Sequence, residues 1–129
     1  MATVGLSYVI DSGNRLATGT LSGIVHGSDI ASGIKAVYED PAWQPGFDTV
    51  WDSTGIEQLL LQLGDLPSFV ALHRDYATRS GTGKEIIIVS RALDTAMAKT
   101  YAVMMRNAAR AVHVCHSRTQ AAQILGRPL

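Results

Sequence analysis

The chain has 129 residues, 47% of them hydrophobic, and its 11 basic residues balance its 11 acidic residues. This length predicts a single domain over residues 1–129. A neutral chain has no basic surplus to hold a phosphate backbone, so we expect no nucleic-acid partner. The single cysteine excludes an internal disulfide and fits a reducing cytoplasm. Without a signal-peptide pattern or an apolar stretch of membrane-spanning length, we expect a cytoplasmic protein without membrane insertion.

The chain begins with the pattern of a β-hairpin followed by a helix. Residues 6–10 and 15–25 are strand-compatible and flank a turn rich in polar residues and glycine. The helix is expected to start near Ser28, a good N-cap residue, with Asp29 in its first turn. It should end before Pro41, because the residue that precedes a proline is pushed out of the α region.

The middle of the chain contains one ambiguous segment. Residues 47–52 predict a strand, whereas the leucine-rich residues 56–63 are compatible with either helix or strand. Asp65 and Pro67 are typical of a helix start. The leucines before them should then belong to another element, so we favour an extended segment near 58–63.

The second half of the chain alternates helices and strands. The predicted elements are a helix over 66–80 closed by glycines, a strand over 85–89, a helix over 92–109, a strand over 112–115 and a helix from a capping box at Ser117 to Gly126. The β-branched run 85–89 suits a strand covered on both faces. The predicted order is ββαββαβαβα. It favours an α/β domain with a mixed sheet and helices over at least one face.

The most specific chemical pattern is the run Asp52, Ser53, Thr54 and Gly55. We expect the strand to stop there, with a turn at Gly55 and with both hydroxyls exposed, as switch or binding residues often are at strand ends. One interpretation is an ordinary turn in which Asp52 and Ser53 bond the local backbone. The other is a phosphorylatable hydroxyl, because a phosphate would add nearly two negative charges to an exposed loop.

Two groups of apolar residues are candidates for recognition. Trp43 and Phe47 lie on a loop with proline and glycine, where they either anchor a protein partner or cover the edge of the sheet. Met97, Tyr101 and Met104 on the predicted helix 92–109 either line an apolar ligand pocket, form a dimer face or pack in the core. The full apolar stripe of that helix comprises Leu93, Ala96, Met97, Tyr101, Met104, Met105 and Ala108.

The remaining motifs do not add up to a catalytic or metal site. A phosphate-loop interpretation of residues 81–84 fails because Lys84 is followed by an acid rather than a hydroxyl, and the loop precedes its strand. His113 and His116 lack the spacing of a zinc pair, so we expect no metal and no cofactor.

The remaining reactive side chains are expected to have no catalytic role. Cys115 is expected to be a buried, inert thiol rather than the partner of His116. His73 should be a partly buried core histidine. An enzyme that uses Asp52 with His73 or His116 has no geometric support in the spacing.

The chain resembles the SpoIIAA-like group of bacterial single-domain proteins, which are related in fold to STAS domains and linked with SEC14-type lipid-binding domains. The resemblance covers nearly the whole length. It rests on the opening hairpin, on residues 38–41, 45–52, 86–90, 112–114 and 120–125, and on Ala98 and Tyr101. It implies a mixed sheet with helices packed alongside. The run 52–55 is also similar to the Asp-Ser-Ser-Gly motif of STAS-type anti-sigma-factor antagonists, which would place Thr54 at the phosphorylated position.

Two functions therefore lead. The first is a non-enzymatic regulatory or protein-interaction domain of the STAS-like type, with an unknown protein partner and a possible phosphoswitch at Thr54 or Ser53. The alternative is a domain that binds a small apolar, lipid-like molecule of the SEC14 type. A homodimer is a further expectation, because the chain is neutral and a sheet of this kind leaves its edges exposed.

Overall fold

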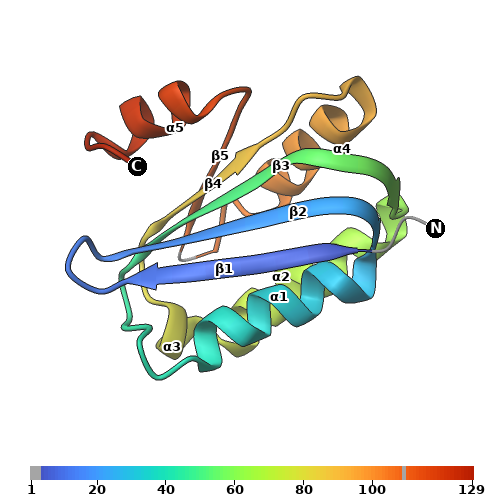
Figure 1. The fold of residues 1–129 in the computed structure, drawn as a ribbon. Helices are drawn as coiled ribbons and strands as arrows, with labels where there is room; N and C mark the ends of the chain where they lie inside the picture. Colours follow the sequence, from blue (N-terminus) through green and yellow to red (C-terminus); the bar gives the residue numbers. More distant parts are fainter. Residues whose placement is uncertain (1–3, 109) are drawn as a thin grey trace.

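The computed structural model of the protein describes residues 4–108 and 110–129. Within them, a mixed sheet has the strand order β1-β2-β3-β4-β5 (Figure 1). The strands are β1 (Gly5–Asp11), β2 (Leu16–His26), β3 (Asp48–Leu60), β4 (Lys84–Ile88) and β5 (Ala111–Cys115). The pair β1–β2 is antiparallel and forms the predicted hairpin, and the other neighbouring strands are parallel. The predicted α/β class with a mixed sheet is confirmed.

Helices cover both faces of the sheet. They are α1 (Gly27–Glu39), the short 3₁₀ helix η1 (Leu63–Asp65), α2 (Leu66–Asp75), α3 (Ala77–Ser80), α4 (Ala92–Met104) and α5 (Arg118–Leu125). Ile86 and Ile88 of β4 share a buried cluster with Leu125 of α5. Ile87, between them, faces the opposite side and packs against the cluster that contains Phe69 of α2 and Tyr101 of α4. The strand predicted to be covered on both faces is therefore covered by different helices on each.

The predicted order separates two strands, 47–52 and 58–63, where the structure has a single strand, β3, which begins at Asp48 and ends at Leu60. The chain does not turn at Gly55. A Cβ atom there would lie 3.0 Å from the Cβ of Ser22, so the glycine instead permits a close approach between β2 and β3. From the pair Thr20–Asp52 to the pair Ile24–Gln58, β2 advances four residues and β3 advances six. The two extra residues are bulges, which bend β3 while it stays paired.

Most predicted helix ends agree with the structure, but two ends differ and one predicted helix is interrupted. Helix α1 begins at Gly27 rather than Ser28, with His26 as N-cap residue, and the His26 amide donates to the Asp29 carboxylate at 2.8 Å. The predicted helix 66–80 is interrupted at Tyr76. Helix α4 ends at Met104, and the last position of the predicted helix 92–109 lies outside the described residues. Among the described residues, no helix combines the length and the apolar character that crossing a membrane requires.

The buried face of α4 differs from the predicted stripe. Asp94, Ala98 and Tyr101 are its buried residues, whereas Leu93 is 78% exposed and Met104 is 37% exposed. Successive helical residues point about 100° apart, so a face that includes Asp94 turns Leu93 away from the core. The apolar residues alone predicted a different orientation of α4, because an acid was not expected on its buried face.

Trp43 and Phe47 are part of the core, so of the two predicted alternatives the exposed partner anchor does not fit. Trp43 is fully buried and Phe47 is 4% exposed. The Trp43 indole nitrogen donates to the backbone oxygen of Arg79 at 2.8 Å. The buried Arg110 guanidinium lies 5.4 Å from the Trp43 ring and donates to the backbone oxygen of Phe47 at 2.8 Å. These long-range contacts fold the loop onto the body of the domain.

Candidate functional site

The candidate site is an apolar cleft at the carboxyl end of β4. Strand β4 pairs with β3 only as far as Asp52 and Ile88, whereas β3 remains paired with β2 as far as Leu60. The later half of β3 therefore has no strand on its β4 side, and α4 lies there instead. Ligand sites of α/β proteins commonly lie beyond the carboxyl ends of parallel strands.

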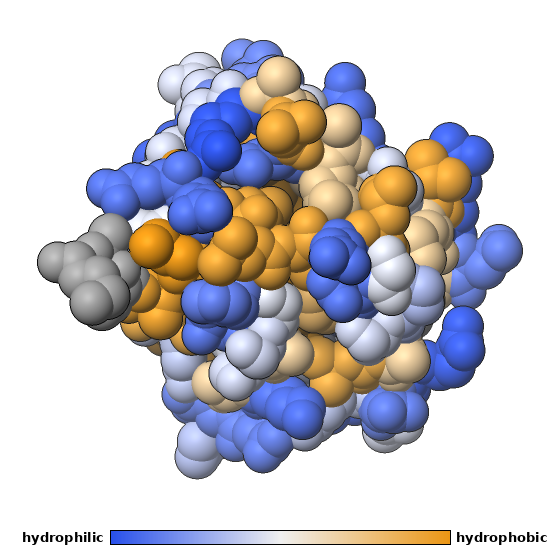
Figure 2. All heavy atoms as spheres, turned by 90° about the vertical axis from the view of Figure 1, so that its right-hand side faces the viewer, coloured by the Kyte–Doolittle hydropathy of each residue, from blue (hydrophilic) through white to orange (hydrophobic). Residues whose placement is uncertain are grey.

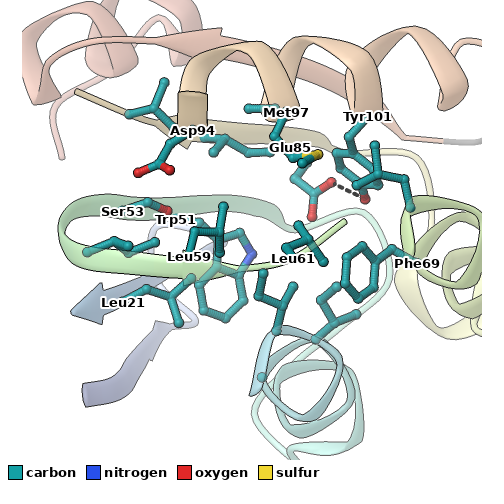
Figure 3. Close-up of a pocket in the computed structure, with 18 of the residues that line it drawn as sticks. Leu21, Trp51, Ser53, Leu59, Leu61, Phe69, Glu85, Asp94, Met97 and Tyr101 are labelled. Atoms are coloured by element: carbon teal, nitrogen blue, oxygen red, sulfur yellow. Dashed lines mark hydrogen bonds between the residues drawn. The ribbon is translucent and has the colours of Figure 1, made fainter. Parts of the chain in front are cut away.

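The cleft has a volume of about 100 Å³ and is lined mainly by hydrophobic side chains. Figure 2 shows hydrophobic residues gathered in a band across this side of the molecule. Figure 3 shows the interior, with α4 on one side and the end of β3, α1 and α2 around the rest. The lining residues are Leu6, Leu21, Ile30, Gly33, Ile34, Trp51, Ser53, Ile56, Leu59, Leu61, Leu66, Phe69, Glu85, Ile87, Val89, Asp94, Met97, Ala98 and Tyr101.

Glu85, on β4, is one of two buried carboxylates in this lining. It is 2% exposed, and its Oε2 accepts a hydrogen bond from the Tyr101 hydroxyl at 3.0 Å. Its Oε1 lies 3.5 Å from Nε2 of the buried His73, whose Nδ1 lies 3.2 Å from the Tyr38 hydroxyl. A buried carboxylate is costly unless such partners surround it. Glu85 therefore belongs to a network that joins β4 to α1, α2 and α4.

The two tyrosines of this network are held in their protonated form. Burial, followed by the negative charge of Glu85, raises the pKa of Tyr101 well above its ordinary value. Burial and Glu85 likewise raise the pKa of Tyr38, although Arg110 opposes the shift. Tyr101 thus remains a hydrogen-bond donor to Glu85 throughout the physiological range of pH.

Asp94, in the first turn of α4, is the second buried carboxylate. It is 5% exposed, and its Oδ2 lies 3.7 Å from Nε of Arg91. Among the described residues, its carboxylate accepts no hydrogen bond from the protein. Figure 3 shows Asp94 directed into the cleft at the same end as Ser53, which is 7% exposed. This end offers hydrogen-bond acceptors that are removed from bulk water.

The predicted site residues 52–55 lie within β3 and point to two sides of the sheet. Ser53 lines the cleft and is buried, which corrects the prediction that both hydroxyls are exposed. Thr54 is exposed, and its backbone amide and hydroxyl donate to Oδ1 of Asp52 at 3.1 and 2.7 Å. Oδ2 of Asp52 accepts from Nε of Arg118 on α5 at 3.1 Å. The error follows from placing a strand end at Gly55, because side chains alternate between faces in a strand that continues.

The environment of Asp52 favours its ionised form. Partial burial raises the pKa of this carboxyl, but the hydrogen bonds from Thr54 and Arg118 together outweigh the burial and lower the pKa below its ordinary value. Asp52 is thus paired with Thr54 and Arg118 rather than with a histidine. His116 contacts the backbone oxygen of Val89 through Nδ1 at 2.9 Å.

The other predicted candidates fall at different places. Met97 and Tyr101 line the cleft, whereas Met104 does not and is partly exposed. Cys115 is buried, and burial raises the pKa of its thiol, which keeps it protonated. Among the described residues, no group of three or more His, Cys, Asp or Glu side chains could hold a metal ion.

The sequence interpretation missed Glu85 and Asp94 as site residues. Glu85 opens the β-branched run of β4, and acids are rarely buried unless they are paired, so an acid in a doubly covered strand was an available signal. Asp94 has the ordinary appearance of an acid in the first turn of a helix. Its burial depends on how α4 is rotated against the sheet, which the sequence pattern predicted wrongly.

One solved structure has a fold similar to that of this chain. An uncharacterized protein of the DUF3478 family from Shewanella loihica PV-4, described as having a SpoIIAA-like fold, aligns with 97% of this chain and 95% of its own length. The TM-score is 0.60 and the sequence identity is 10%. The fold is SpoIIAA-like. No protein-family model matches the chain, and no curated protein does. The SpoIIAA-like fold predicted from the framework residues is thereby confirmed.

Proposed function

We propose that this protein is a non-enzymatic binding domain that holds a small apolar molecule in the cleft. The observation that carries the proposal is a cleft of about 100 Å³ whose walls are almost entirely hydrophobic. An engineered protein cavity of about 150 Å³ with similar walls binds benzene. The closed part of the cleft therefore suits a single ring or a short alkyl chain, and a longer molecule would extend through the opening.

The test is binding of toluene and indole, followed by amide chemical shifts in two-dimensional NMR. We expect saturable shifts at residues of α4 and of the end of β3. Ala98→Leu should weaken the binding at least tenfold, because Ala98 is 8% exposed and lines the cleft. Ala96→Leu is the matched control, since Ala96 is exposed on the same helix. The proposal fails if neither probe binds, or if both variants lose binding equally.

A second candidate is a regulatory domain that acts through protein contacts, with Thr54 as the switch. The observation that favours Thr54 over Ser53 is exposure, because Ser53 is buried whereas Thr54 lies at the surface. The Thr54 hydroxyl donates to Asp52 at 2.7 Å. A phosphate there would remove this donor and place a dianion beside a carboxylate, which would release Asp52 and attract Arg118.

Mass spectrometry of the protein after co-expression with its cognate kinase would test the switch. We expect phosphate on Thr54 and none on Ser53. The Thr54→Val variant, which keeps the shape of the side chain, should carry no phosphate. An unmodified Thr54 in the presence of the active kinase would refute this candidate and leave ligand binding in the cleft unaffected.

The partner proposed for this regulatory role is a second copy of the chain. Strand β1 is an edge of the sheet, and its Val9 is 69% exposed. An open edge with an exposed apolar side chain favours strand pairing between molecules. Light scattering should then give twice the monomer mass, and Val9→Lys should restore the monomer. A monomer at high protein concentration would rule the homodimer out.

A further inference from the structure

The charged residues that line the cleft are both acidic. Glu85 and Asp94 both face the cleft, and its lining contains no lysine, arginine or histidine. Both carboxylates are at least nine-tenths buried, with exposed fractions of 2% and 5%. Water therefore screens them weakly, and their charges act strongly on anything that enters. An anionic ligand, such as a fatty acid, would meet two carboxylates in the lining, and the nearest cation to Asp94 is Arg91, which lies outside the lining.

The two carboxylates differ in how many of their hydrogen-bond acceptor positions remain unused. Glu85 accepts from Tyr101 at 3.0 Å and has His73 at 3.5 Å. Asp94 has only the Nε of Arg91 at 3.7 Å, and accepts no hydrogen bond among the described residues. An ionised carboxylate has about four acceptor positions. Most of those on Asp94 are consequently free, although the side chain is buried.

Arg91 forms an ion pair with Asp94, but its Nε lies 3.7 Å from Oδ2, which is beyond hydrogen-bond distance. Its Nη1 donates to the backbone oxygens of Ile56 and Glu57 on β3. The arginine thus bridges the start of α4 to the bulged part of β3 at the rim of the cleft. Its side chain is 40% exposed, whereas that of Asp94 is 5% exposed. The remaining acceptor positions of Asp94 face the cleft interior (Figure 3).

We propose that the cleft selects small organic cations, namely primary amines with a ring or a short alkyl body. This inference rests on the proposed function and specifies its ligand. The ammonium group lies against Asp94 and the Ser53 hydroxyl, and the apolar body lies against Trp51, Leu59 and Met97. An ammonium group has three donors for these acceptors. Charge-assisted hydrogen bonds to a buried carboxylate are stronger than neutral ones.

A series of compounds that share one ring separates the contribution of ligand charge to affinity from that of ligand shape. The series is benzylamine, benzyl alcohol, toluene and phenylacetate, each titrated into the full chain at pH 7 and followed by NMR or calorimetry. We expect benzylamine to bind at least about tenfold more tightly than toluene, in line with one charge-assisted hydrogen bond. Phenylacetate should bind least. This comparison requires no variant, so it holds even where a substitution impairs folding.

The variant Asp94→Asn tests whether the Asp94 carboxylate is responsible for the preference for amines. This variant keeps the size of the side chain and removes its charge, so benzylamine should lose about tenfold in affinity while toluene changes by less than about twofold. Glu57→Gln is the matched control, because Glu57 is exposed next to the cleft-lining Ile56 and carries the same charge. It should leave both affinities unchanged.

The outcomes separate the two proposals. Toluene that binds as tightly as benzylamine, or phenylacetate that binds more tightly, overturns the amine selectivity and leaves the apolar cleft intact. Equal benzylamine affinity in the wild type and in Asp94→Asn also overturns it. Absence of binding by all four compounds overturns both the selectivity and the proposed function.

Discussion

Glu85 and Asp94 are two buried carboxylates that face the same cleft, and they differ in the partners that surround them. Glu85 has a donor at 3.0 Å from Tyr101 and a neighbour at 3.5 Å in His73, so its charge is matched by fixed groups from two helices. Asp94 has one arginine at 3.7 Å, and that arginine is bonded elsewhere. A buried acid with its own partners holds elements together, whereas a buried acid without them is available to a ligand.

The largest change in stability is expected from substitution of Glu85. Glu85→Ala should lower the free energy of unfolding by about 3 kcal/mol, because the buried Tyr101 hydroxyl loses its acceptor and His73 loses the carboxylate that lies 3.5 Å from its Nε2. Urea unfolding measures the change. Glu85→Gln is the control, since its amide oxygen still accepts from Tyr101, and it should lose less than half as much. Equal losses in the two variants would contradict the assigned role of the network.

Tyr101→Phe removes one donor to Glu85 and keeps the ring in the core. We expect a loss of about 2 kcal/mol in unfolding free energy, the usual range for a hydrogen bond to a charged group. The same denaturant titration applies. Combined with Glu85→Ala, the tyrosine substitution should add little further loss, because both changes remove the same interaction. Additive losses would show that the two side chains act separately.

Asp52, on the opposite side of β3, supplies a reference carboxylate nearer the surface. Its pKa is lowered, so the unfolded chain takes up the proton first as the pH falls. The resulting stability is present above the ordinary pKa of an aspartate and is lost as the pH falls through the folded-state pKa. Asp52→Asn should cost less than about 1 kcal/mol at pH 7, as for partly exposed ion pairs.

The dependence on pH is the sharper readout for Asp52. The difference in urea midpoint between the wild type and Asp52→Asn should shrink as the pH is lowered from 7 to 3. A difference that stays constant over this range would show that the hydrogen bonds of Asp52 do not depend on its charge.

The smallest effect on stability is expected at Asp94. Asp94→Asn loses a favourable interaction of about 0.5 kcal/mol with the first turn of α4, but it also relieves the burial of a charge. We expect the unfolding free energy to change by less than about 0.5 kcal/mol while amine binding falls. A loss near that of Glu85→Ala would mean that Asp94 is structural, and the contrast between the two acids would disappear.

Much of the local structure was predictable because it depends on neighbours in the chain. Pro41 follows the end of α1, Ser117 caps α5 by accepting from the Gln120 amide at 3.1 Å, and Gly126 ends α5 in the left-handed conformation. The hairpin and the two-sided burial of β4 followed from turn residues and β-branched composition in the same way. These features require only short-range sterics and hydrogen bonds.

The sequence alone also determined the alternation of strands and helices, and with it the mixed sheet, while the resemblance to the SpoIIAA-like group implied the SpoIIAA-like fold. The tertiary structure decided what Gly55, Trp43 and Asp94 do. Gly55 could either turn the chain or allow a close strand contact, and Ser22 selects the second. Trp43 is buried because Arg79 and Arg110, far along the chain, hold its loop. Asp94 faces a cleft because β4 stops where β3 continues, and strand pairing between distant segments sets that difference in length.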